Sequence, residues 1–132
     1  MFVRIELVYT QGQEKVYVLK NDKFRRNRGG DSRLYDINCV KWNSRVLLYQ
    51  KDGPGNLLRC YIDRIFEPEI YTALQEDKSL RVKSLLTLKC LDCGEVIGFP
   101  MIYARWRENR LAYRLKRGSF HKQLNHSQTK WK

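Results

Sequence analysis

Two cysteines, Cys90 and Cys93, are the residues whose spacing points most directly to a chemistry. They stand in the segment Lys89-Cys90-Leu91-Asp92-Cys93-Gly94. The two residues between them form a tight turn that lets both thiolates bind one metal ion, and the glycine lets the backbone fold back. This C-x2-C-G pattern is typical of a zinc knuckle. A redox-active cysteine pair is the alternative, but such a pair usually precedes a helix, whereas residues 95–97 predict a strand.

A second, incomplete knuckle begins at Cys39. The sequence C-V-K-W-N-S-R-V from Cys39 aligns with C-L-D-C-G-E-V-I from Cys90. Trp42 then stands at the position of Cys93. Asn43 replaces the glycine, and Asn is the next most tolerant residue for a positive φ. Zinc takes four such ligands. We predict that the three cysteines of the two knuckles supply three of them to one zinc ion.

Cys60 is the first candidate for the fourth ligand. It stands in L-L-R-C-Y-I-D, where the alternating apolar residues favour a buried, inert thiol as the other interpretation. The histidines His121 and His126 are five residues apart and do not form a ligand pair on their own. Zinc is expected at this one site. The alternative is that the site has lost its metal and that a packed Trp42 ring takes the metal's place. Two structural disulfides are the weakest interpretation, because no secretory signal indicates an oxidising compartment.

The elements that must position these residues are mainly β-strands. Alternating apolar residues predict strands at 2–9, 15–20, 34–38, 45–50, 57–66, 81–89, 95–99, 101–107 and 110–116. A short helix is expected over 69–77, after Pro68. We therefore expect a small two-sheet domain over residues 1–118 with at most one short helix. It contains an N-terminal hairpin (1–20), a basic loop (21–30) and two knuckle halves (34–66 and 81–117), and a basic tail (119–132) follows.

Positive charge dominates the composition. The 132 residues include 26 Lys+Arg against 14 Asp+Glu, a formal net charge of +12. Such a charge attracts polyanions, of which RNA or DNA is the commonest. The candidate nucleic-acid-binding residues are Arg25, Arg26, Arg28, Arg105, Arg107, Arg110, Arg114, Lys116, Arg117, Lys122, Lys130 and Lys132. On the strand from Arg110, the bases alternate with apolar residues and are expected to form a charged face. A merely solvated surface is the alternative.

The sequence does not favour an enzyme. It contains no Ser/His/Asp arrangement in a motif context, no Gly-rich phosphate loop and no H-E-x-x-H pattern. The thiol of Cys60 is expected to point at the core, whereas a nucleophile needs exposure and a lowered pKa. No apolar run approaches the ~20 residues of a membrane span. We expect an intracellular, cytoplasmic protein that is not an enzyme and has no membrane or small-molecule partner.

The number of residues between the two knuckles is similar to that of a known group of proteins. Between Trp42 and Cys90 lie 47 residues, too many for a compact zinc ribbon, whose knuckles are ~15–20 residues apart. The spacing is similar to that of β-tent proteins such as Yippee and the thalidomide-binding domain of cereblon. The resemblance covers residues 36–120 and includes Ile97-Gly98, an aromatic hairpin through Tyr103, and Gly118-Ser119-Phe120.

The resemblance implies two β-sheets pinned at their apex by one zinc ion between two distant C-x2-C knuckles. This chain departs from the family at Trp42, where the family has a ligand. Compact zinc ribbons of ribosomal and transcription proteins are the second comparison.

Two functional hypotheses follow from these observations. The first is a non-catalytic zinc-binding domain that binds structured RNA or a ribonucleoprotein surface through the basic loop and the C-terminal segments. It predicts binding that weakens steeply with salt. The second is a protein–protein interaction module of the β-tent type that binds an acidic partner protein. It predicts a partner that is retained after nuclease treatment.

Overall fold

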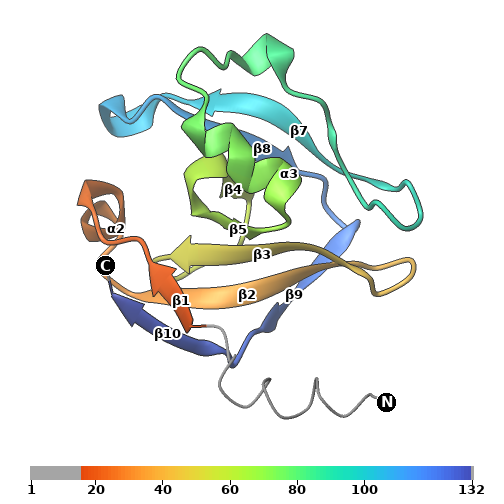
Figure 1. The fold of residues 1–132 in the computed structure, drawn as a ribbon, viewed down its shortest axis with the longest axis horizontal. Coiled ribbons are helices and arrows are strands. Elements are labelled where there is room, and N and C mark those ends of the chain that lie inside the picture. The colour runs from red at the N-terminus through yellow and green to blue at the C-terminus, as the bar shows by residue number, and fades with distance from the viewer. Residues whose placement is uncertain (1–15, 132) are drawn as a thin grey trace, which may run out of the picture.

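The computed structural model describes residues 16–131, and these residues form a mainly β fold, as predicted (Figure 1). Two sheets have four strands each, in the orders β5-β3-β2-β9 and β4-β8-β7-β6, and β1 and β10 form a two-stranded sheet. The strands are β1 Val16–Leu19, β2 Ser32–Cys39, β3 Arg45–Asp52, β4 Arg59–Tyr61, β5 Ile65–Glu67, β6 Leu88–Lys89, β7 Val96–Tyr103, β8 Arg110–Leu115, β9 Phe120–Leu124 and β10 Gln128–Trp131. None of the helices in the described part has the length and apolar character that crossing a membrane requires.

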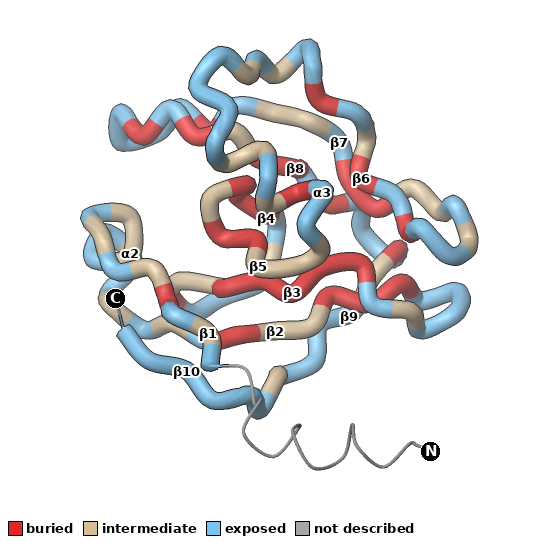
Figure 2. Tube along the Cα trace, in the orientation of Figure 1, coloured by how far each residue is buried: buried red, intermediate tan, exposed pale blue. Residues whose placement is uncertain are grey.

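The main core lies between the two four-stranded sheets. Ile37 of β2, Ile97 of β7 and Tyr113 of β8 belong to one cluster of buried side chains. A second, smaller cluster joins Leu19 of β1 to Leu48 of β3. Strand β3 is therefore covered on both faces, which explains its unbroken apolar run. Figure 2 shows that the buried residues follow β3 through the centre of the molecule.

The described chain has two short α-helices, where at most one was expected. Helix α3 Glu69–Thr72 and the 3-10 turn η2 Ala73–Glu76 occupy the predicted helical segment. The other helix, α2 Lys23–Asn27, lies in the segment expected to be a basic loop. Asp22 caps it by accepting hydrogen bonds from the amides of Phe24 at 3.0 Å and Arg25 at 3.2 Å. One helical turn is too short to show a 3.6-residue period in the sequence. Only the N-cap residue Asp22 could have indicated this helix.

The predicted strand at 57–66 is divided between the two sheets. Its first part is β4, its second part is β5, and the 3-10 turn η1 Ile62–Arg64 carries the chain from one sheet to the other. The predicted strand at 81–89 is also shorter than expected. It consists of the 3-10 turn η3 Val82–Ser84 and the two-residue strand β6. Turn η1 has buried residues and turn η3 has none, and periodicity alone does not separate a short strand from a short turn.

The segment expected to be a polar tail forms two strands. Strand β9 pairs antiparallel with β2, and β10 pairs parallel with β1. Most side chains of β9 and all those of β10 are exposed, so the backbone ladder and not an apolar pattern holds them in place. In the predicted N-terminal hairpin, the first strand lies outside the described residues. Its second strand is β1, which pairs with β10.

Candidate functional site

The two knuckles share one backbone arrangement, as their alignment predicted. The amide of Asn43 donates to the carbonyl oxygen of Cys39 at 2.8 Å, and the amide of Gly94 donates to that of Cys90 at 2.8 Å. The amide of each first cysteine also donates to the carbonyl oxygen five residues later, at 2.8 and 2.9 Å. Asn43 has φ 56° and Gly94 has φ 80°. Both residues take the left-handed conformation that closes the turn.

Cys39, Cys90 and Cys93 come together as predicted. Their sulfur atoms all lie within 4.8 Å of one another, and Cys39 Sγ is 3.4 Å from Cys93 Sγ. A tetrahedral zinc with Zn–S of about 2.3 Å requires sulfurs about 3.8 Å apart, which agrees with this spacing. The first knuckle follows β2 and the second lies between β6 and β7, so the triad joins the two four-stranded sheets. The three thiolates could therefore hold a metal ion.

The backbone around the triad favours a thiolate at Cys39. Burial raises the pKa of Cys39, but hydrogen bonds from the amides of Trp42 and Lys41 and from the other two thiols outweigh it, so the pKa is lowered. The Lys41 amide lies 3.4 Å from Cys39 Sγ. At Cys93 a hydrogen bond from the amide of Glu95 lowers the pKa, but burial and the neighbouring cysteines raise it above its ordinary value. Deprotonated sulfur is the form that binds a metal.

The structure places Cys60 outside the triad. It lies in β4 opposite Tyr113 of β8, is fully buried, and belongs to the main core. Burial raises the pKa of its thiol well above the ordinary value. These are the properties of an inert core thiol. The ring of His121 is hydrogen-bonded through Nε2 to Asn43 Oδ1 at 2.7 Å, and neither His121 nor any other described His, Asp or Glu joins the three sulfurs.

Trp42 does not fill the place of a metal. Its side chain is 63% exposed, whereas Cys39 and Cys90 of the triad are buried. The interpretation in which a packed Trp42 ring replaces the metal is therefore wrong. The indole lies on the solvent side of the first knuckle.

The predicted nucleic-acid-binding residues fall into three groups by exposure. Most are exposed, namely Arg26, Arg105, Arg107, Arg114, Lys116, Arg117, Lys122 and Lys130, whereas Arg25 and Arg28 are half-buried. Arg110 is only 4% exposed and donates to both carboxylate oxygens of Asp63, at 2.6 and 3.2 Å. Arg110 therefore does not share a charged face with Arg114, because η1 brings Asp63 over the start of β8. Lys132 lies outside the described residues.

Helix α2 links two of the predicted basic segments through aromatic rings. The Arg25 guanidinium lies 4.0 Å from the ring centre of Trp131, and that of Arg28 lies 5.5 Å from the ring centre of Trp106. Trp131 is 45% exposed and Trp106 is 64% exposed. In Figure 1, α2, the C-terminus and the loop between β7 and β8 lie at the end of the molecule opposite the turns that carry the knuckles.

We call this group the basic-aromatic surface. Its members are the two tryptophans and the described bases of α2, of the β7–β8 loop and of β10: Lys23, Arg25, Arg26, Arg105, Trp106, Arg107, Lys130 and Trp131. The sequence predicted most of its bases, but neither the helix nor the pairing of Arg25 with Trp131.

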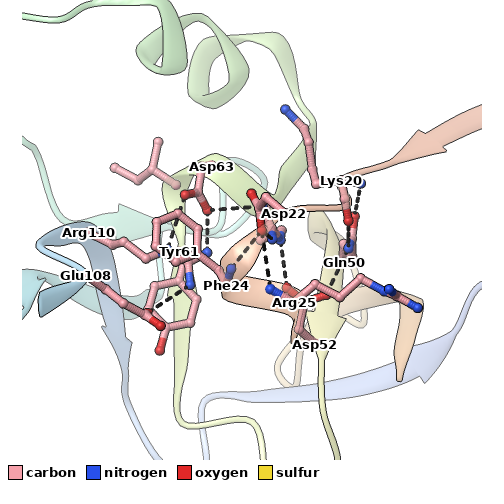
Figure 3. A network of polar contacts seen from close by, with 12 residues as sticks. Lys20, Asp22, Phe24, Arg25, Gln50, Asp52, Tyr61, Asp63, Glu108 and Arg110 are labelled. Carbon is pink, nitrogen blue, oxygen red and sulfur yellow. Dashed lines mark hydrogen bonds and ion pairs between the residues drawn. The ribbon is translucent and has the colours of Figure 1, made fainter. Parts of the chain in front are cut away.

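A network of buried charges holds α2 to the body of the fold (Figure 3). Glu108 accepts hydrogen bonds from both terminal nitrogens of Arg28, at 2.8 and 2.9 Å. Arg64 is 1% exposed and donates to Asp52 at 2.7 Å and to Asp22 at 2.6 and 3.2 Å. Sequence reasoning missed this network. One signal was available, because Glu108 is the single acid in the otherwise basic segment 105–132.

Comparisons with known proteins add no relative. No protein-family model, no curated protein and no solved structure matches this chain.

Proposed function

We propose that the protein is a non-enzymatic, zinc-binding β domain that binds structured RNA through its basic-aromatic surface. The observation that carries the proposal is that Arg25 of α2 and Arg28, the C-cap residue of α2, lie against exposed tryptophans at one end of the fold. Unpaired bases stack on aromatic rings and on guanidinium planes, and arginine binds phosphate bidentately. Trp106 and Trp131 supply the rings, and the arginines of the basic-aromatic surface supply the phosphate contacts, whereas Arg28 beside Trp106 is bound to Glu108.

The charges of this surface are available to phosphate. Among the described residues, Arg26, Arg105 and Arg107 take part in no ion pair, and the carboxylates close to α2 are already engaged. Asp22 binds Arg64, and Glu108 binds Arg28. The network of buried charges therefore neutralises the acids near α2 and leaves the exposed bases with a net positive charge. Such a surface attracts RNA by releasing its counterions.

Zinc has a structural role in this proposal. Bound by Cys39, Cys90 and Cys93, it would crosslink the two four-stranded sheets at the end opposite α2, and a metal bound only in the folded state stabilises the fold. The two distant knuckles are the feature on which we propose a relationship with β-tent proteins.

Fluorescence anisotropy with a labelled stem-loop RNA tests the proposed binding. We expect affinity to fall steeply as salt rises. Trp131→Ala and Trp106→Ala each remove one stacking partner, which is worth about 1–3 kcal/mol per base. Trp42→Ala is the matched control, because Trp42 is as exposed as Trp106 and more exposed than Trp131 but lies at the knuckle end. Salt-independent binding, or an equal loss of affinity in Trp42→Ala, would contradict the proposal.

A protein-interaction module is the second candidate, and one observation favours it. Ile70, Leu86 and Leu91 are 55%, 84% and 70% exposed and line a cavity of about 480 Å³ beside α3, together with Tyr71 and Tyr113. Exposed apolar surface of this kind often marks a protein contact. Under this alternative, a partner purified with the protein survives nuclease treatment and is lost from Leu86→Glu. The same partner would be retained by Trp131→Ala.

A further inference from the structure

We propose that the metal held by Cys39, Cys90 and Cys93 takes its fourth ligand from outside the chain, and that this ligand is the thiolate of an anionic thiol. The inference rests on the metal binding proposed above. It goes further because the centre then becomes an exchangeable binding site in addition to a crosslink between sheets.

The chain itself offers no thiol or imidazole to complete the set. It contains four cysteines and two histidines, and all six lie within residues 16–131. Cys60 is buried in the core on β4. His121 pairs with Asn38 across the β2–β9 ladder, whereas Cys39 pairs with Phe120. Because side chains alternate along a strand, His121 points to the opposite face of the sheet from Cys39. His126 follows β9, is exposed, and does not join the sulfur group.

In the alignment of the two knuckles, Trp42 stands at the sequence position where a fourth cysteine ligand would be. The matching hydrogen bonds of the two knuckles place the Trp42 backbone where the second knuckle has Cys93. The Trp42 side chain nevertheless turns to solvent and is 63% exposed. Zinc sites with three protein ligands keep a fourth position that an outside ligand can enter, whereas structural sites are closed by four. This chain has the three-ligand pattern, with the open position on the solvent side of the first knuckle.

The charges beside the knuckles favour an anionic ligand. A hollow of about 240 Å³ is lined by Lys41, Lys116 and Arg117, and Glu95 is the single acid among the described residues that line it. Glu95 lies 3.3 Å from Lys41 Nζ and 3.8 Å from Lys116 Nζ. Three cations and one carboxylate leave a net charge of +2. Lys41 and Glu95 each stand two residues after a cysteine of the triad. Thiolate is the soft donor that matches a thiolate-rich site, and carboxylates on the same molecule would contact the cations of the hollow.

Cobalt substitution tests the inference without reference to any activity. Zinc is replaced by Co²⁺ in the full chain, and the visible bands of the cobalt centre are followed while glutathione is added. Cysteamine, a thiol of opposite charge, is the matched small molecule. We expect the bands to shift to saturation with one cobalt retained per chain, and glutathione to bind about tenfold more tightly than cysteamine. An acidic cysteine-containing peptide that shifts the bands at lower concentration than glutathione would assign the thiolate to a partner protein.

Two variants at Trp42 locate the ligand position. Trp42→Cys supplies a fourth thiolate from the chain, so its cobalt bands should not respond to glutathione. Trp42→Ser is the matched control and should respond as the wild type does. The double variant Lys41→Gln/Lys116→Gln should lose most of the preference for glutathione over cysteamine.

The outcomes that overturn the inference differ from those that overturn metal binding. If cobalt binds but no thiol changes its bands, or if Trp42→Cys still responds, the exchangeable position is refuted and the metal centre stands. If glutathione and cysteamine bind equally, the anionic preference is refuted. If the folded protein binds no cobalt and no zinc, the proposed metal centre fails as well.

Discussion

Replacing Glu108 with Gln tests how α2 is held to the body of the fold. The Glu108 side chain is 1% exposed. It accepts hydrogen bonds from Arg28 at 2.8 and 2.9 Å and from Asn27 at 3.2 Å, and it lies 3.3 Å from Arg110 Nη1. Glutamine keeps the shape of the side chain and removes the negative charge. Two guanidinium groups then lose a carboxylate that they share in the interior.

The expected loss of stability follows from the burial of these partners. Removing one member of a buried ion pair costs about 3–5 kcal/mol, because the other charge is left uncompensated. Solvent can partly compensate the unpaired charge of Arg28, since its side chain is 13% exposed. Arg110 keeps its two hydrogen bonds to Asp63. We therefore expect Glu108→Gln to lower the free energy of unfolding by about 2–3 kcal/mol at neutral pH.

The effect should also depend on pH. Burial raises the pKa of Glu108, but hydrogen bonds from Arg28 and Asn27 outweigh it, and the pKa in the folded protein lies below the ordinary value. For a carboxyl group with a depressed pKa, the stabilisation is fully present above the unfolded pKa, about 4.3, and is lost as pH falls through the folded pKa. The difference between wild type and Glu108→Gln should therefore shrink below about pH 4.

Urea denaturation followed by tryptophan fluorescence measures the difference. With a slope of about 1–3 kcal/mol per molar urea, the midpoint should move by about 1–2 M. Glu76→Gln is the matched control, because Glu76 is an exposed carboxylate on η2, and its loss should change stability by less than about 0.5 kcal/mol. A loss below about 1 kcal/mol in Glu108→Gln, or a loss of equal size at acidic pH, would refute the argument.

Four further changes test other parts of the fold. Arg64→Met leaves the Asp52 carboxylate, which is 3% exposed, without its cation, and should cost about 3–5 kcal/mol in urea denaturation; an unchanged midpoint would contradict this. Gly53 has φ 82°, and a Cβ there would lie 2.8 Å from the carbonyl oxygen of Arg28, so Gly53→Ala should lower the melting temperature, whereas Gly55→Ala, where a Cβ would have no atom of residues 16–131 within 4 Å, should lower it less. Cys39→Ser should lose bound zinc in elemental analysis, whereas Cys60→Ala should retain it; the reverse result would make Cys60 a ligand. Truncation after residue 118 removes β9 and β10 and exposes the edge of β2, so cooperative unfolding in circular dichroism should weaken or disappear; an unchanged transition would mean that the segment is a dispensable tail.

The knuckles show what could be predicted from local sequence. The positive φ of Asn43 and Gly94 and the paired hydrogen bonds of the two turns depend on residues within a few positions of each other. The alignment of the two turns therefore predicted their geometry correctly, and with it the meeting of Cys39 with Cys90 and Cys93. The same reasoning could not decide the role of Cys60. An alternating segment predicts that one face is buried but does not say what that face meets.

The segments that were misassigned share a different cause. Helix α2 has one turn and β10 has no buried side chain, so neither carries a period that sequence analysis can detect. Their stability comes from partners elsewhere in the chain. Arg64 binds the cap residue Asp22, and β1 pairs with β10. The basic-aromatic surface was predicted only as separate basic segments for the same reason.

The sequence by itself determined the mainly β class, most strand positions and the three-cysteine site, because alternation and turn residues act over short distances. Only the tertiary structure decided that Arg110 is buried and that Trp42 faces solvent. It also decided that Arg25 of α2 meets Trp131 and that Arg28, the C-cap residue of α2, meets Trp106. A charged or aromatic side chain can lie at the surface or in the interior of a protein. Its place depends on whether a distant segment brings a counter-charge such as Asp63 or Glu108, or leaves the side chain in water.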